Sequence, residues 1–147
     1  MKEDKDIDID FNQFKGRVKN SHLPKLLSEL VRNHKGKQSP GWIYVYHKEG
    51  DDLNVMKVGR TLGKVGVNKR LNQWQRKCNQ KLFLIRKWFC LKHQICEQMI
   101  HLELKLNGYW CGKRKCICKG THKEFFRANE QTLMETVDFW VDYFNHN

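Results

Sequence analysis

Two short stretches of β-branched and aromatic residues, 42–46 and 55–59, constrain the fold of this chain more than any other feature. The first reads Trp-Ile-Tyr-Val-Tyr and the second Val-Met-Lys-Val-Gly, with the turn residues Gly50-Asp51-Asp52 between them. Such residues favour β-strands, and two strands joined by so short a connection pair antiparallel. We therefore predict a β-hairpin in the first half of the sequence.

Apolar residues at helical spacing lie on both sides of this hairpin. They predict helices at residues 21–38, 67–78, 94–106 and 128–145, with a further strand at residues 82–89. Residues 1–20 alternate charges with isolated Ile and Phe and show no sustained period, which predicts a flexible N-terminal arm. A length of 147 residues fits a single domain.

The net charge of +12 is concentrated in one part of the chain. Residues 53–127 contain 18 basic and three acidic residues, whereas residues 128–147 contain four acidic residues and no Lys or Arg. So basic a segment attracts polyanions, and binding through phosphate contacts weakens as salt is added. Nucleic acid is therefore the expected partner; the alternative is a solvated basic surface without a dedicated partner.

The sequence has no feature of a membrane or secreted protein. No stretch approaches the roughly 20 apolar residues of a membrane-spanning helix, and the N-terminal Met-Lys-Glu-Asp-Lys-Asp lacks the apolar core of a secretion signal. We expect an intracellular protein with no membrane partner, located in the nucleus if the source is eukaryotic. In a reducing compartment its six cysteines are expected as buried thiols or metal ligands.

One group of these cysteines has the spacing of a possible metal site. Cys116, Cys118 and His122 fall within seven residues, and Cys111 or Cys78 could supply a fourth ligand for a structural zinc ion. Buried thiols without metal remain the alternative, because cysteine is often a small core residue. Cys90 and Cys96 lie in apolar strand and helix patterns, and we expect them in the core.

Four ordered motifs together carry a resemblance to a known superfamily. They are Gly41-Trp-Ile-Tyr-Val-Tyr, Lys57-Val-Gly-Arg-Thr, Lys69-Arg-Leu-Asn-Gln-Trp and Cys96-Glu-Gln-Met-Ile-His. Residues 40–126 resemble the GIY-YIG nucleases, and within them the phage open-reading-frame type of DNA-binding domain and its fungal meiotically upregulated relatives. The resemblance implies an α/β (α+β) domain with a small three-stranded antiparallel or mixed sheet flanked by helices. We expect the C-terminal segment, residues 127–147, to contribute a helix that packs on this domain.

The resemblance also implies roles for three residues. Tyr44 would orient the attacking water, Arg70 would stabilise charge on the phosphate, and Glu97 would hold a divalent cation, magnesium or manganese. Each has a plainer alternative. Tyr44 could pack in the core, Arg70 could contact only the DNA backbone, and Glu97 could be a surface carboxylate paired with Lys92 or Lys105.

Two departures from the nuclease pattern bear on catalysis. Lys57 stands where the second motif usually begins with tyrosine, and Trp74 stands where a polar residue is common. We therefore predict first a duplex DNA-binding protein with weak catalysis, second a metal-dependent endonuclease, and third a zinc-stapled protein-interaction domain. The expected DNA contacts are Lys57, Arg60, Lys64, Lys69, Arg76 and Lys77.

Overall fold

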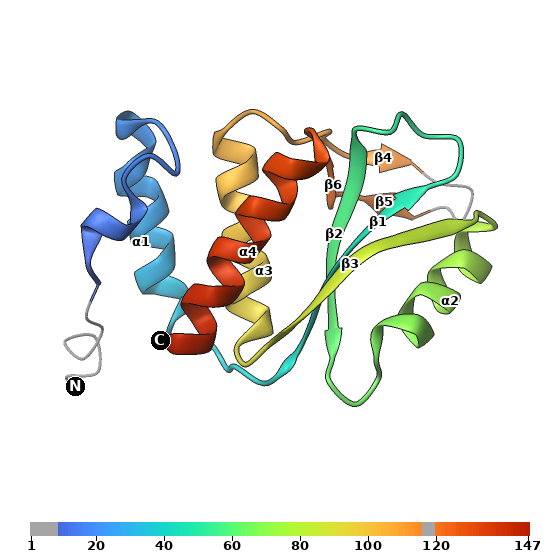
Figure 1. The fold of residues 1–147 in the computed structure, drawn as a ribbon, viewed down its shortest axis with the longest axis horizontal. Coiled ribbons are helices and arrows are strands. Elements are labelled where there is room, and N and C mark those ends of the chain that lie inside the picture. Colours follow the sequence, from blue (N-terminus) through green and yellow to red (C-terminus); the bar gives the residue numbers. More distant parts are fainter. Residues whose placement is uncertain (1–8, 116–119) are drawn as a thin grey trace.

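The computed structural model describes residues 9–115 and 120–147, and its centre is an antiparallel sheet. The sheet has the order β3-β1-β2-β6 (Figure 1). Its strands are β1 (Gly41–Lys48), β2 (Val55–Leu62), β3 (Leu82–Cys90) and β6 (Phe125–Arg127). The predicted β1–β2 hairpin is confirmed, with Tyr44 opposite Gly59. The sheet has four strands where the resemblance implied three, because β6 adds to the free edge of β2.

Helices cover both faces of the sheet, so the predicted α+β class is confirmed. The helices are α1 (Leu23–Asn33), α2 (Val67–Cys78), α3 (His93–Leu106) and α4 (Glu130–His146). Figure 1 shows α3 and α4 side by side on one side of the sheet, with α1 beyond them and α2 alone on the other side. In the described part of the chain, every helix is too short or too polar to cross a lipid bilayer.

The alternation of side chains along β1 creates two separate apolar layers. Ile43 and Val45 belong to the larger core, which includes α3 and α4. Tyr44 and Tyr46 point to the opposite face and join a smaller cluster beneath α2. Since successive residues of a strand face opposite sides of its sheet, this register brings both tyrosines to the side of α2.

A short hairpin lies beside the main sheet. It consists of β4 (Arg114–Lys115) and β5 (Thr121–His122), and its connecting residues 116–119 are outside the described structure. Arg114 donates two hydrogen bonds to the carboxylate of Asp51, at 2.8 and 3.0 Å, which ties the hairpin to the turn between β1 and β2. The hairpin therefore keeps the segment before β6 close to β2.

The N-terminal segment differs from the flexible arm that the sequence predicted. Two 3₁₀ turns, Phe11–Phe14 and Asn20–His22, precede α1. Phe14 and Val18 are buried in the larger core, and Arg17 forms an ion pair with the buried Glu103 at 2.8 Å. Residues 9–20 thus pack on the domain, while residues 1–8 are outside the described part of the chain.

Candidate functional site

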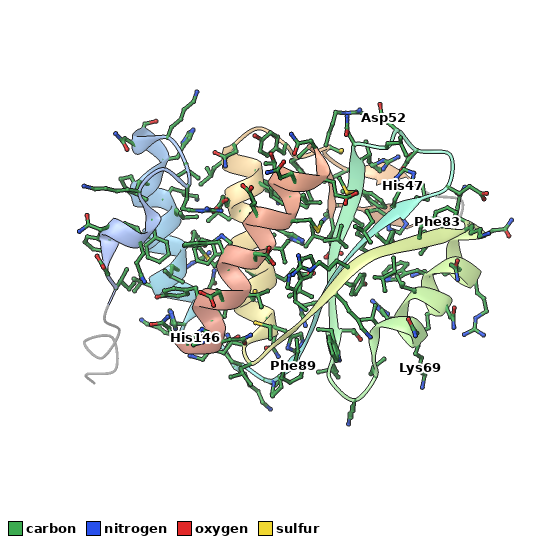
Figure 2. All side chains as sticks on the ribbon, viewed as in Figure 1. His47, Asp52, Lys69, Phe83, Phe89 and His146 are labelled. Atoms are coloured by element: carbon green, nitrogen blue, oxygen red, sulfur yellow. The ribbon has the colours of Figure 1, made fainter. Side chains whose placement is uncertain are left out.

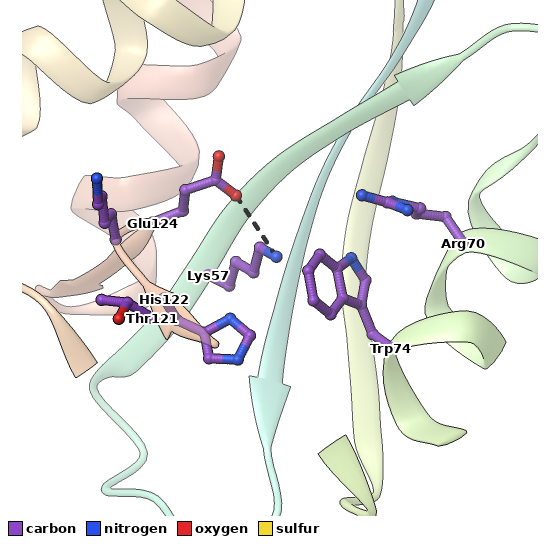
Figure 3. Close-up of a pocket in the computed structure, with 7 residues that line it drawn as sticks. Lys57, Arg70, Trp74, Thr121, His122 and Glu124 are labelled. Atoms are coloured by element: carbon purple, nitrogen blue, oxygen red, sulfur yellow. Dashed lines mark ion pairs between the residues drawn. The ribbon is translucent and has the colours of Figure 1, made fainter. Parts of the chain in front are cut away.

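Two adjoining cavities lie between the sheet, α2, α3 and the β5–β6 connection. The first, of about 210 Å³, is lined by Tyr44, Lys57, Arg60, Arg70, Glu97 and Glu124. The second, of about 250 Å³, shares Lys57, Arg70 and Glu124 with the first and adds Trp74, Thr121, His122 and Lys123 (Figure 3). We call the two cavities together the cleft. It gathers seven residues that the sequence singled out separately, which are Tyr44, Lys57, Arg60, Arg70, Trp74, Glu97 and His122.

Glu97 projects from α3 into the cleft rather than onto the surface. It is buried, and Arg60 Nε of β2 donates to its Oε1 at 3.2 Å. The alternative of a surface carboxylate paired with Lys92 or Lys105 is therefore wrong. Burial and the negative charge of Glu124 together raise the pKa of Glu97 to about 8, against the opposing charge of Arg60.

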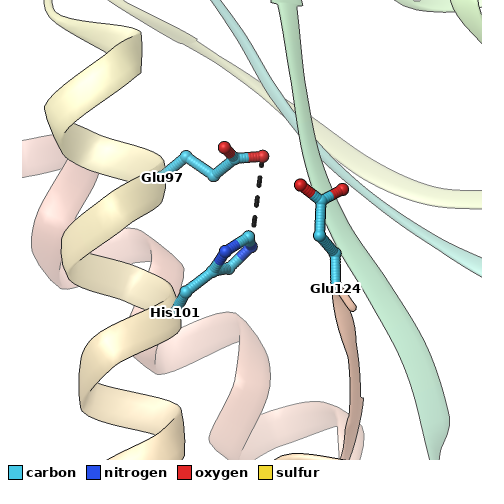
Figure 4. A group of neighbouring side chains, drawn as sticks. All are labelled: Glu97, His101 and Glu124. Carbon is cyan, nitrogen blue, oxygen red and sulfur yellow. Dashed lines mark ion pairs between the residues drawn. The ribbon is translucent and has the colours of Figure 1, made fainter. Parts of the chain in front are cut away.

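Glu97 forms a compact group with Glu124 and His101. Their possible metal-ligand atoms lie within 4.8 Å of one another, and Figure 4 shows the two carboxylates pointing toward the same space from α3 and from the segment before β6. Two carboxylates at this separation suit a hard divalent cation, which prefers oxygen ligands. Sequence reasoning missed Glu124, although it is the only acidic residue between Glu103 and Glu130.

His101 supports this group rather than completing a ligand set through its Nε2 atom. That atom lies 2.8 Å from the carbonyl oxygen of Val58, which can only accept, so Nε2 carries a hydrogen and donates it. Burial lowers the pKa of His101, which keeps the ring neutral. The two carboxylates are therefore the metal ligands that this arrangement offers most directly.

The raised pKa of Glu97 predicts a pH-dependent stability. The carboxyl group binds its proton more tightly in the folded chain than in the unfolded chain, so it lowers stability progressively from about pH 4.5 to about pH 8. Without added magnesium or manganese, the gain in unfolding free energy of Glu97→Gln over wild type should therefore grow with pH, to a few kcal/mol near pH 8. Urea unfolding of both proteins at several pH values measures this gain, and parallel pH profiles would contradict the assignment.

Lys57 is buried at the base of the cleft instead of lying on an outer DNA-binding surface. Its Nζ lies 3.4 Å from Oε1 of Glu124 and 3.8 Å from the centre of the Trp74 ring (Figure 3). Burial lowers the pKa of Lys57, and the charge of Glu124 opposes that change. Lys57, which stands where the nuclease motif usually has a tyrosine, therefore holds the Glu124 carboxylate in place beneath the indole of Trp74.

Tyr44 is buried above Gly59 with its hydroxyl at the cleft. A Cβ atom at Gly59 would lie 2.6 Å from the Tyr44 hydroxyl oxygen, so only glycine at this position leaves room for the ring. Burial raises the pKa of Tyr44 to about 12, while Trp74 and Arg70 act in the opposite direction. The hydroxyl consequently stays protonated near neutral pH, where it can orient a water molecule but is a poor base.

Arg70 faces the cleft from the first turn of α2. Its guanidinium carbon lies 4.8 Å from the centre of the Trp74 ring, and Nη1 donates to Oε1 of Gln73 at 3.2 Å. The ring and the amide fix the plane of the guanidinium, and no described carboxylate forms an ion pair with it. It is therefore available to a phosphate group that enters the cleft.

The remaining expected DNA contacts lie on the outside of α2 and on the turn before it. Lys64, Lys69, Arg76 and Lys77 are exposed, and Figure 2 shows Lys69 pointing away from the body of the domain. Arg60 is partly exposed at the rim of the cleft, where it already pairs with Glu97. The exposed basic residues therefore lie on or just before α2, the helix that also lines the cleft through Arg70 and Trp74.

The structure describes part of the predicted zinc group. Cys116 and Cys118 lie outside the described residues, whereas Cys78 Sγ lies 3.5 Å from His122 Nε2. Cys111 is half-buried and packs against the cluster around Tyr44 and Tyr46. Cys90 and Cys96 are buried in the core, as predicted.

Fold and cleft together define a small α+β domain that presents paired carboxylates and a fixed arginine inside a strongly basic surface. The chain belongs to the T5orf172 domain family, whose model matches residues 41–141. This is a family of nuclease-like, DNA-binding domains. No curated protein and no solved structure matches the chain.

Proposed function

We propose that this domain binds duplex DNA across α2 and the cleft, and that the cleft hydrolyses a phosphodiester bond with magnesium or manganese, in the manner of a GIY-YIG nuclease. The observation that carries the proposal is the convergence of Glu97 and Glu124 in a cavity that Arg70 and Tyr44 also line. In such a cleft the carboxylate pair can bind a divalent cation, while the surrounding basic residues bind the phosphate of the substrate.

Each residue of the cleft has a definite task in this reaction. Glu97 and Glu124 would hold the cation, which supplies Lewis acidity toward the scissile phosphate. The Tyr44 hydroxyl orients the water, and the Arg70 guanidinium stabilises charge that develops on the phosphate oxygens. Lys57 is a positioning residue, because its ion pair fixes the carboxylate of Glu124.

A DNA-binding module without catalysis is the second candidate, and two ion pairs favour it. Arg60 pairs with Glu97 and Lys57 pairs with Glu124, so both carboxylates are balanced by protein cations without a metal. In this candidate the cleft grips the DNA backbone through Arg70. The protein-interaction alternative instead places an acidic protein on the basic surface.

Nicking of supercoiled plasmid tests the proposal most directly. The wild-type protein should convert supercoiled to relaxed plasmid in magnesium or manganese and should lose that activity in excess chelator. Titration with Mn²⁺, followed by electron paramagnetic resonance, should independently show a bound ion. Binding of plasmid without nicking and without bound Mn²⁺ would instead establish the non-catalytic module.

Duplex binding should depend steeply on salt. If Lys64, Lys69, Arg70, Arg76 and Lys77 each neutralise one phosphate, the logarithm of the association constant should fall with the logarithm of salt concentration with a slope of about −4 to −5. Fluorescence anisotropy with a labelled duplex measures the slope. Lys77→Ala should make it shallower by about one, whereas Lys25→Ala on the distant α1 should not change it. A flat response would favour the acidic-protein alternative.

A further inference from the structure

Cys78 and His122 meet beside the cleft although 44 residues separate them in sequence. Cys78 is the last residue of α2, and His122 is the last residue of β5. Their Sγ and Nε2 atoms lie 3.5 Å apart, and both residues line a small pocket together with Tyr46 and Trp74. The fold thus brings a thiol and an imidazole together from two different elements.

This separation is the one that a shared zinc ion requires. Zinc binds cysteine sulfur at about 2.3 Å and histidine nitrogen at about 2.0–2.1 Å, so two ligands at a tetrahedral angle lie about 3.5 Å from each other. A thiol–imidazole hydrogen bond has a similar length, so the experiment must separate the two.

We propose that Cys78 and His122 are two ligands of a structural zinc ion that joins the end of α2 to the β4–β5 hairpin. The sequence predicts Cys116 and Cys118 as ligands, but both lie outside the described residues. The remaining zinc ligands are therefore to be identified by substitution. Among the described residues, Cys111 does not form a three-ligand group with the pair. The sulfur and nitrogen ligands suit zinc, whereas the carboxylates of Glu97 and Glu124 suit a harder cation.

Zinc at this position would fix the width of the cleft. Trp74 lies one turn before Cys78, and its ring meets the His122 ring edge-on, with centroids 5.4 Å apart. Arg70 is one further turn along the same helix, while Glu124 follows His122 by two residues. The ion would therefore hold the arginine-bearing helix at a set distance from a carboxylate of the proposed magnesium site.

Metal content distinguishes zinc binding from a simple hydrogen bond. Elemental analysis of the purified wild-type protein should find about one zinc per chain, and Cys78→Ser and His122→Ala should each reduce this at least tenfold. Cys111→Ser is the matched cysteine control and should keep its zinc. Glu97→Gln should also keep it, so that loss of nicking and loss of zinc are separable results.

Replacing zinc by cobalt in the wild-type protein tests the ligand set even if the variants do not fold. Wild-type protein reconstituted with Co²⁺ should show tetrahedral d–d bands and a thiolate-to-cobalt charge-transfer band, and Cys78→His should keep tetrahedral bands with weaker charge transfer. Wild-type protein that binds neither zinc nor cobalt would overturn the proposal. So would full zinc content in a folded Cys78→Ser variant.

Discussion

Replacing Glu97 by Gln should abolish metal-dependent nicking while leaving duplex binding intact. The amide has the shape of the protonated carboxyl group that burial favours, so the packing of α3 is preserved, but it cannot supply the negative charge that holds a divalent cation. Stabilisation of about 3 kcal/mol by the cation corresponds to a loss of about 100-fold or more in the nicking rate. Duplex affinity should stay constant where Glu97 is already protonated, and it should rise slightly where Glu97 is ionised, because the amide carries no negative charge near the phosphates.

A control substitution of a glutamate outside the cleft tests whether the location of the carboxylate matters. Glu135→Gln changes the same side chain on the exposed face of α4 and should nick plasmid at the wild-type rate. Glu124→Gln should resemble Glu97→Gln if the two carboxylates share the cation. Nicking by Glu97→Gln at the wild-type rate would exclude Glu97 from catalysis.

Periodic segments with strong local signals could be predicted closely from the sequence. The helix expected at residues 67–78 has those bounds in the structure, and the strand expected at 82–89 extends by one residue to Cys90. In both segments, the apolar residues whose spacing favours a helix or a strand are also residues that pack against the rest of the domain. Local and tertiary preferences therefore agree, and the pattern is sufficient.

Segments stabilised by distant contacts could not be predicted in the same way. Strand β6 has three residues and no period to detect, and it forms because Val55–Lys57 presents a free edge to it. The segment around Phe14 is mostly polar, but this buried phenylalanine stacks on Trp140 of α4, with ring centroids 5.5 Å apart. A single aromatic residue carries no periodic signal, so the core that receives it must be known first.

The candidate site was partly visible in the sequence for a related reason. Glu97 stood out because it ends a run of 44 residues without an acid, and Glu124 is isolated in the same way. The sequence could not show that these two acids converge, because α3 and the β5–β6 connection are brought together only by the sheet. Nor could it show that Lys57 pairs with Glu124, since that contact requires the lysine to be buried beneath Trp74.

Replacing Arg70 by Ala should reduce the nicking rate much more than the duplex affinity. The guanidinium lines the cleft with Glu97, Glu124 and Tyr44, so its interaction with phosphate should strengthen as negative charge develops during hydrolysis. We expect a loss of about 100-fold or more in rate, measured with saturating protein on plasmid, and a loss of less than about 10-fold in affinity. Arg70→Lys should recover affinity but little of the rate, because an ammonium group lacks the planar fork.

Arg76→Ala on the same helix is the control for a simple phosphate contact. Arg76 is exposed and lines neither cavity of the cleft, so its loss should weaken binding modestly and leave the rate at saturation unchanged. If the domain only binds DNA, Arg70→Ala and Arg76→Ala should weaken binding by similar factors, with no nicking in either protein or in wild type. The ratio of rate loss to affinity loss at these two positions therefore separates a nuclease from a DNA-binding module, because only a catalytic arginine acts more strongly on the transition state than on the bound duplex.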